Sequence, residues 1–192
     1  MRSKKIVGKV LALFVFIILA LSFFIVYPAE ALSPRSTLPG FQLTMPDSSE
    51  IKAYLGIMGT KPFPWSQIQG KLLVIEFFEV FCPVCLGNAP ILNQLFKFIQ
   101  EDKDLGNNVK MVGIEVGSDP KDLAVYQHKF KVEFPLFLDP KKEIQASLKI
   151  KNVPLLIVVG KKGKVFMSHT GRIENIDTIL LEIRKLAKEA IR

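Results

Sequence analysis

Residues 74–92 read VIEFFEVFCPVCLGNAPIL, and the order of residues here is the main indication of the fold. Glu76 is the only charged residue in the apolar run Leu72–Phe78, a pattern typical of a strand that is covered on both faces. Cys82 and Cys85 follow the run, and apolar residues then recur at helical spacing. The order predicts a buried strand that ends at a cysteine pair, which in turn begins an amphipathic helix.

A C-x-x-C pair at the start of a helix has a chemical use. The Cys82 thiol would lie near unsatisfied backbone N–H groups and the positive end of the helix dipole, which favour the nucleophilic thiolate. Cys85 would lie one turn further in, where it can attack a mixed disulfide formed by Cys82. Pro83 lacks an N–H and therefore fits the first helical turn. The pattern predicts a redox-active pair.

Other uses of the two cysteines fit less well. A structural zinc site usually needs four Cys or His ligands, and here only His128 and His169 could be added, both far from the cysteines in sequence. A c-type haem site needs a His directly after the second Cys, where Leu86 stands. A structural disulfide that closes so short a loop would contribute little chain entropy. We therefore expect redox use and no bound metal.

Beyond this helix, predicted strands and helices alternate. We expect strands at Val109–Val116 and 134–138, helices beginning at Asp119-Pro120 and Asp139-Pro140, a hairpin at 155–168 and a last helix from Ile176. This order predicts an α/β fold, a central mixed sheet flanked by helices, with parallel strand pairs and a terminal antiparallel hairpin. Short apolar pieces at 51–57 and 65–68 suggest a further hairpin before the first long strand.

The N-terminal segment is expected to be a targeting or membrane-anchoring segment rather than part of the folded domain. Residues 10–27 are eighteen residues without a charge, and as a helix they would cover about 27 Å, close to the thickness of a bilayer core. Four basic residues precede them, which predicts a cytoplasmic N-terminus. We expect 1–27 to be a single-pass anchor in the cytoplasmic membrane. A signal cleaved after Ala31, giving a secreted periplasmic form, remains the alternative.

Composition and charge exclude some classes of protein and partner. The 192 residues are 49% hydrophobic and 23% charged, which excludes a disordered chain. The net charge is +8, but without the four basic residues before the apolar segment it is +4. No basic run remains, so we expect no nucleic-acid partner. We divide the chain into the segment 1–27, a Pro-containing tether at 28–45 and one domain at 46–192.

The quoted stretch resembles the active-site strand and helix of thioredoxin-fold proteins. The resemblance lies in an acid six residues before Cys82, an aromatic directly before it and Ala89-Pro90 after it. Asn152-Val153-Pro154 is similar to the cis-proline loop of that fold. The 69 positions from Cys85 to Pro154 suit TlpA-like, membrane-tethered thiol–disulfide oxidoreductases. The resemblance covers about residues 36–192 and implies a thioredoxin-like fold with an α-plus-β insertion and an N-terminal extension.

Glu76 is a candidate for proton transfer. Burial in an apolar strand would raise the pKa of its carboxyl group. Such a group could exchange a proton with Cys85 through a water, so that the second thiol can attack. A wet strand end with a merely solvated Glu76 remains the alternative.

Residues around the cysteines are candidates for substrate binding. The resemblance implies that Pro154 takes a cis bond beside the cysteines and exposes the backbone of Val153 to an extended substrate; an ordinary trans proline is the alternative. Glu79, Phe81 and Val84 would rim the reactive sulfur, or they are loop residues without that role; Pro83 is a further candidate for substrate contact. Phe81 stands where the family usually has Trp. Val84 replaces the His of DsbA-type proteins, which makes a strong oxidant less expected.

The resemblance implies an extracytoplasmic protein-disulfide reductase of the cytochrome c maturation type. Its substrates would be the thiols and disulfides of exported proteins, and a membrane thiol-transfer protein would supply electrons, so no dissociable cofactor is expected. Two alternatives remain. One is a disulfide-forming oxidant, because Glu76-Phe77-Phe78 and Phe81-Cys82-Pro83 look like DsbA. The other is a copper-binding assembly module that uses its thiols as ligands.

Overall fold

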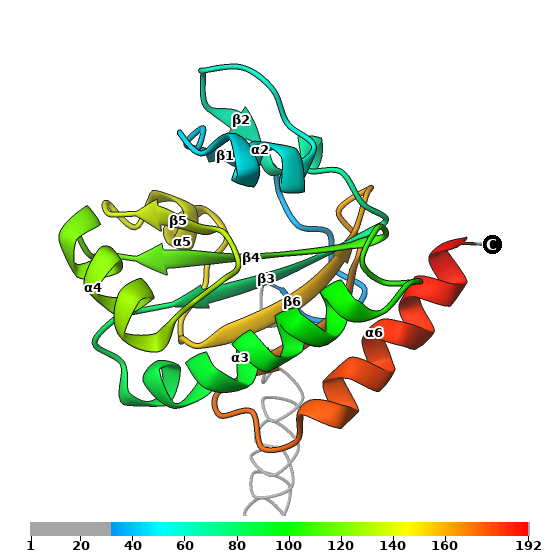
Figure 1. The fold of residues 1–192 in the computed structure, drawn as a ribbon. Helices are drawn as coiled ribbons and strands as arrows, with labels where there is room; N and C mark the ends of the chain where they lie inside the picture. The colour runs from blue at the N-terminus through cyan, green and yellow to red at the C-terminus, as the bar shows by residue number, and fades with distance from the viewer. Residues whose placement is uncertain (1–31, 192) are drawn as a thin grey trace, which may run out of the picture.

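The structure, a computed structural model, describes residues 32–191. The expected membrane segment 1–27 and the alternative cleavage point after Ala31 lie outside this range. The elements run in chain order as shown in Figure 1: β1 (Gln42–Leu43), α2 (Ser49–Leu55), β2 (Phe63–Pro64), the 3-10 turn η1 (Trp65–Gln67), β3 (Leu72–Phe78), α3 (Pro83–Glu101), β4 (Val109–Val116), α4 (Pro120–Phe130), β5 (Leu136–Asp139), α5 (Glu143–Ser147), β6 (Leu155–Gly160), β7 (Val165–Thr170) and α6 (Ile176–Ile191). Among these residues, no helix combines the length and the apolar character needed to cross a membrane.

The five-stranded sheet has the order β5-β4-β3-β6-β7. β3 pairs in parallel with β4, which pairs in parallel with β5, whereas β6 runs antiparallel to β3 and to β7. This confirms the predicted mixed sheet with an antiparallel terminal hairpin. β3 is the middle strand and is buried along its whole length. The cysteine pair therefore follows the end of a fully buried central strand.

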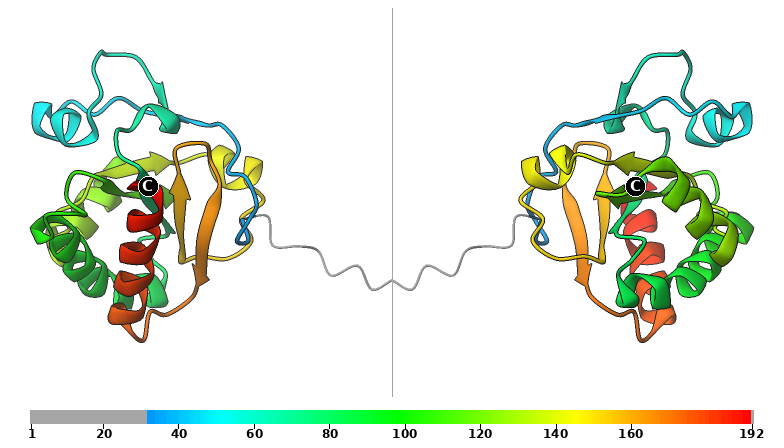
Figure 2. Two further views of the ribbon diagram at one scale, coloured as in Figure 1. Left: turned by 90° about the vertical axis from the view of Figure 1, so that its right-hand side faces the viewer. Right: turned by 90° about the vertical axis from the view of Figure 1, so that its left-hand side faces the viewer.

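The two faces of the sheet bury separate apolar clusters, because successive side chains of a strand point to opposite faces. On β3, Val74 and Phe78 join the cluster formed with α3, α4 and α6. Leu73, Ile75 and Phe77 join the cluster formed with α5 and with the N-terminal extension, which is the part of the described chain before β3, residues 32–71. Figure 1 and Figure 2 show α3 and α6 side by side on one face and the extension over the other.

Local signals set most helix ends as predicted. Asp119 caps α4 by accepting hydrogen bonds from the N–H groups of Lys121 and Asp122, and Pro120 occupies the first turn. The prediction for α5 is wrong in position, because this helix begins at Glu143 rather than at Asp139. Asp139 ends β5 instead, and its carboxylate reaches forward to accept from the N–H of Gln145.

The N-terminal extension differs most from the prediction. The apolar piece at 51–57 is not a strand of a hairpin but lies mainly in helix α2, which Ser48 caps and Gly56 ends in a left-handed conformation. β1 pairs with β2. From residue 32 onward the expected tether is part of the domain, since Leu38, Phe41 and Leu43 are buried against the sheet. The sheet face opposite α3 and α6 needs an apolar cover, and this Pro-containing segment supplies part of it.

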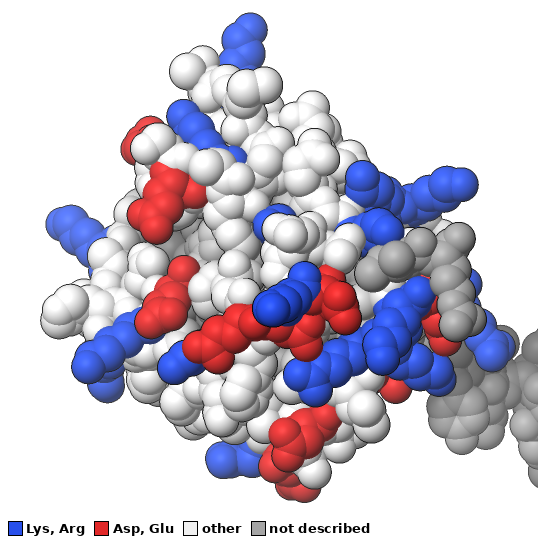
Figure 3. Space-filling view, turned by 45° about the vertical axis from the view of Figure 1, so that its right-hand side comes forward, with Lys and Arg blue, Asp and Glu red and all other residues white. Residues whose placement is uncertain are grey.

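Charged side chains of both signs are interspersed on the face drawn in Figure 3. Two ion pairs involve α3 and its C-terminal cap: Lys97–Glu101 at 3.8 Å and Arg184–Asp102 at 3.1 Å. Both lie at the solvent-accessible surface and therefore contribute little to stability.

Candidate functional site

The two cysteines lie where β3 passes into α3. Cys82 caps the helix: its sulfur accepts a hydrogen bond from the N–H of Cys85 at 3.4 Å, and its own N–H donates to the carbonyl of Glu79 at 3.1 Å. Pro83 fills the first turn, as predicted. Both cysteines are free thiols; Cys82 is partly exposed, whereas Cys85 is fully buried. One sulfur is therefore open to a visiting molecule and the other is sheltered one turn behind it.

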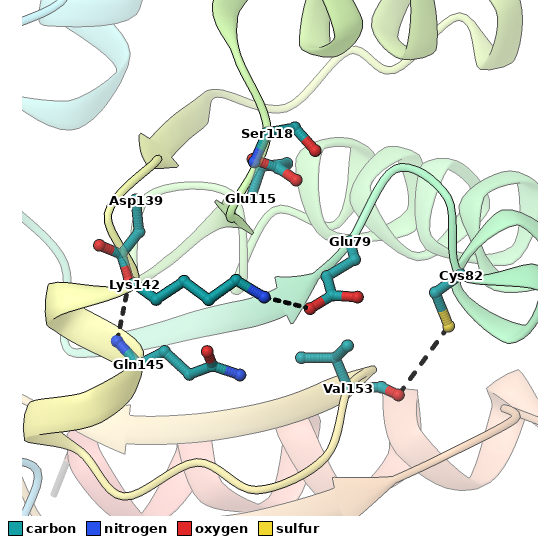
Figure 4. A network of polar contacts seen from close by, with 8 residues as sticks. All are labelled: Glu79, Cys82, Glu115, Ser118, Asp139, Lys142, Gln145 and Val153. Carbon is teal, nitrogen blue, oxygen red and sulfur yellow. Dashed lines mark hydrogen bonds and ion pairs between the residues drawn. The ribbon is translucent and has the colours of Figure 1, made fainter.

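The loop before β6 brings a distant segment against Cys82. The Val153–Pro154 peptide bond is cis, as the resemblance implies. The Cys82 thiol donates a hydrogen bond to the Val153 carbonyl oxygen over 3.9 Å, and Figure 4 shows the two groups facing one another. Val153 is half-buried and Pro154 is buried. The fold thus joins a sulfur and a backbone carbonyl group that are 71 positions apart in sequence.

Glu76 is buried, so the alternative of a wet strand end is wrong. Its side chain is only 1% exposed, and neither carboxylate oxygen has a hydrogen-bond partner among the described residues. Burial raises the pKa of this carboxyl group from 4.5 to about 8. A group with such a pKa can both take up and release a proton near neutral pH.

Cys85 needs a base before it can act as a nucleophile. Burial is the main cause that raises the pKa of its thiol, and the hydrogen bond with Cys82 and the negative charge of Glu76 add to the rise. The thiol therefore stays protonated at neutral pH. Glu76 is the one carboxyl group whose charge acts on this thiol among the described side chains.

The predicted rim residues form the exposed border of the site. Phe81 is 74% exposed, an unusual state for an aromatic side chain, while Pro83 is exposed and Val84 is half-buried. Lys142, directly before α5, reaches across to Glu79 and forms an ion pair at 3.2 Å, which Figure 4 shows. A groove of about 420 Å³ lies beside Phe81, and its lining residues are Glu79, Phe81, Val116, Gly117, Ser118, Asp119, Asp122 and Lys142.

Two residues near the cysteines escaped the sequence analysis. Asn88, one turn after Cys85, is buried; its amide group donates to the carbonyl of Gly171 and accepts from the N–H of Ile173, both at 3.0 Å. It ties α3 to the loop after β7. Tyr126 of α4 is buried in the same cluster as Cys85. Asn88 lies at helical spacing from Cys85 and Leu92, and a polar residue on this otherwise apolar stripe was the available signal in the sequence. Tyr126 gives no such signal, because its sequence position looks like that of any core aromatic residue.

Comparisons with known proteins agree with this geometry. A family model described as thioredoxin-like matches residues 70–165. The thiol-disulfide oxidoreductase ResA of Geobacillus thermodenitrificans is 22% identical over 109 residues, which is 57% of this chain and 60% of that protein. ResA of Bacillus subtilis is 21% identical over 142 residues, covering 74% of this chain and 70% of that protein. The chain therefore spans about three fifths of the length of the Geobacillus relative.

Solved structures show the same fold. A thiol:disulfide interchange protein DsbE from Chlorobium tepidum superposes with a TM-score of 0.64 at 17% identity, covering 81% of this chain and 99% of that one. StoA from Bacillus subtilis superposes with a TM-score of 0.57 at 16% identity, covering 76% and 97%. The family model spans half of the sequence and includes the strand, cysteine pair and helix described above, so the chain belongs to the thioredoxin-like family.

Proposed function

We propose that the protein is an extracytoplasmic thiol–disulfide oxidoreductase that reduces disulfide bonds of exported proteins, as in cytochrome c maturation. The observation that carries the proposal is the pair of free thiols, Cys82 partly exposed at the start of α3 and Cys85 buried behind it. The names of the relatives, thiol-disulfide oxidoreductase ResA, support the reaction class.

The first step is an attack by Cys82 on a client disulfide. A backbone N–H group and the positive end of the α3 dipole face its sulfur, which suits a thiolate nucleophile. A bond forms between the Cys82 sulfur and one client sulfur, while the other client sulfur leaves as a thiolate and takes up a proton.

The second step releases the client. Cys85 gives its proton to the carboxylate of Glu76, and its sulfur attacks that of Cys82. The second client sulfur leaves with its bonding electrons. Two electrons have then passed from the cysteine pair to the client, and the pair is left as a Cys82–Cys85 disulfide.

The client binds across the exposed rim. The Val153 backbone, whose carbonyl group faces Cys82, is placed to pair with an extended client segment. Phe81, Pro83 and Val84 supply apolar contact around the reactive sulfur. Pro154 holds the Val153 backbone beside the cysteines.

The proposal includes a location and an electron source. Residues 1–27 anchor the chain in the cytoplasmic membrane with the domain on the periplasmic side, and a membrane thiol-transfer protein returns electrons to the pair. The charge-free run at 10–27 and the basic residues before it support this orientation. The full chain is expected in the membrane fraction with residues 1–27 intact. A protein whose N-terminus is Leu32 would show cleavage instead.

Trapping tests the reaction. The Cys85→Ser variant is expected to accumulate mixed disulfides with exported proteins through Cys82, because the second step is blocked. The Cys82→Ser variant is the matched control and should capture no client. Failure of Cys85→Ser to trap any client would contradict the proposed reaction.

The redox potential of the pair tests the direction of electron flow. A reductase is expected near the potential of thioredoxin, about −270 mV, whereas a value near about −120 mV would make the protein an oxidant of the DsbA type. Stoichiometric Cu(I) retention that is lost in Cys82→Ser, without disulfide reduction by the wild type, would favour a copper-binding assembly module instead.

A further inference from the structure

The buried layer beside the cysteines contains a hydroxyl group that the reaction above does not use. We propose that Tyr126 of α4 completes an internal proton-transfer site with Glu76, in which its hydroxyl group and an enclosed water hold the carboxylate ready for the proton of Cys85. The inference rests on the proposed function and deepens it. Tyr126 acts as a positioning residue, since it works through Glu76.

The side chains of this layer share one face of the sheet. Glu76 and Phe78 are two positions apart on β3, so they point to the same face. The Tyr126 ring packs on the Phe78 ring, with 4.9 Å between the centroids, and Cys85 is buried in the same cluster. Three elements, β3, α3 and α4, thus direct polar groups into one apolar layer.

Tyr126 and Glu76 both lack hydrogen-bond partners within residues 32–191. The Tyr126 side chain is 3% exposed, and neither its hydroxyl group nor either oxygen of Glu76 is bonded. Unpaired buried polar groups are rare because each loses its hydration without compensation. A hydroxyl donor and a carboxylate acceptor in one layer satisfy each other through a single enclosed water, which needs two to four polar partners.

The neighbouring elements offer few competing charges. The strand partners of Glu76 are Gly113 on β4 and Leu156 on β6, neither of which is ionisable. Glu115 is a buried carboxyl group on the same face of β4; one of its oxygens accepts from the N–H of Ser118, and the other has no partner among the described residues. The buried residues that α6 contributes to the layer are apolar: Ile179, Leu180, Ile183, Leu186 and Ala187. The titratable groups on this face of the sheet are thus Cys82, Cys85, Tyr126, Glu115 further along β4, and His169 of β7, which is in register with Leu156 and whose ring nitrogen lies 2.9 Å from the Arg172 carbonyl oxygen.

Electrostatics agree with the arrangement. Burial is the first cause that raises the pKa of Tyr126, and the negative charges of Glu76 and Cys85 are the other causes. The hydroxyl group therefore remains a hydrogen-bond donor throughout the working pH range. A donor to the carboxylate favours its ionised form, so that more of Glu76 can accept the Cys85 proton in the second step.

The Tyr126→Phe variant removes this donor and keeps the ring packing on Phe78. The rate at which Cys85 resolves a trapped mixed disulfide should rise with pH in the wild type around a midpoint below about 8, the pKa that burial alone gives Glu76. In the variant we expect this midpoint to move up by about one pH unit, with a rate about tenfold lower at pH 7. The matched control is Tyr54→Phe, because the Tyr54 hydroxyl accepts from Met111 near the opposite end of β4. Its profile should not move.

A second readout separates this inference from the proposed function. Infrared titration of the reduced protein follows the protonated Glu76 carboxyl band, which Glu76→Gln identifies, and needs no client. The inference is supported if the band midpoint rises in Tyr126→Phe and not in Tyr54→Phe, even when the wild type reduces no client. It is overturned if the midpoint is unchanged in a folded Tyr126→Phe protein, even when the wild type traps and releases clients normally.

Discussion

Replacing Glu76 with Gln should change how the stability of the reduced protein depends on pH. The folded-state pKa of Glu76 is raised by burial from 4.5 to about 8, so the folded state binds a proton that the unfolded chain has already released. Stability from this group is therefore fully present below pH 4.5 and is lost as the pH rises toward 8. The side-chain amide of the Glu76→Gln variant cannot titrate, so the variant does not suffer this loss.

The shift sets the size of the effect. Between pH 4.5 and 8 the wild type loses at most about 5 kcal/mol of unfolding free energy that Glu76→Gln does not lose, and about 3 kcal/mol of this loss has occurred by pH 7. The thiol of Cys85 stays protonated over this interval and adds little. The free energy of unfolding of the variant, relative to that of the wild type, should therefore increase steadily from pH 5 to pH 8. Any constant difference between an amide and a carboxyl group at this site does not change this trend.

Urea unfolding of both reduced proteins at several pH values measures this difference. Glu133→Gln, at an exposed position just before Phe134, serves as the control and should track the wild type within about 0.5 kcal/mol. The reasoning fails if the difference in unfolding free energy between Glu76→Gln and wild type is the same at pH 5 and at pH 8. That result would mean that the carboxyl group ionises as readily in the folded protein as in water.

Three further predictions concern packing and polar contacts. Leu43→Ala should lower the free energy of unfolding by about 3 kcal/mol, because Leu43 is buried in the extension; Gln42→Ala, exposed on the same strand, should change it by less than about 0.5 kcal/mol, and equal effects would return this segment to the role of a tether. Asn88→Ala should cost about 3 kcal/mol in urea unfolding, since two buried hydrogen bonds are lost; a loss below the error of the titration would contradict the proposed link to the loop after β7. Lys142→Met should cost less than about 1 kcal/mol, a difference that high salt abolishes, because the ion pair with Glu79 is largely exposed; a larger, salt-independent loss would show that the lysine acts through packing.

The elements that could be predicted correctly are those whose signals lie within one short stretch of sequence. The alternation of strands and helices from Leu72 onward, the Asp119-Pro120 start of α4 and the terminal hairpin were all predicted. It failed for 51–57, because so short an apolar piece fits a strand or a helix equally well and the choice depends on what covers it. It also misplaced the start of α5, where Asp139 serves the end of a strand instead.

The features of the candidate site also fall into two groups, those predictable from local sequence and those set by tertiary packing. The spacing of Cys82 and Cys85 after an apolar strand is sufficient to predict the chemistry, since it places one thiol at a helix start and the other a turn behind it. The groups that contact the site from other parts of the chain depend on tertiary packing: the Val153 carbonyl lies at Cys82, Asn88 bonds to Gly171 after β7, and Tyr126 lies in the layer of Glu76. The physical reason is that capping and periodicity act between neighbours along the chain, whereas burial, desolvation and cross-chain hydrogen bonds depend on how the whole sheet is covered.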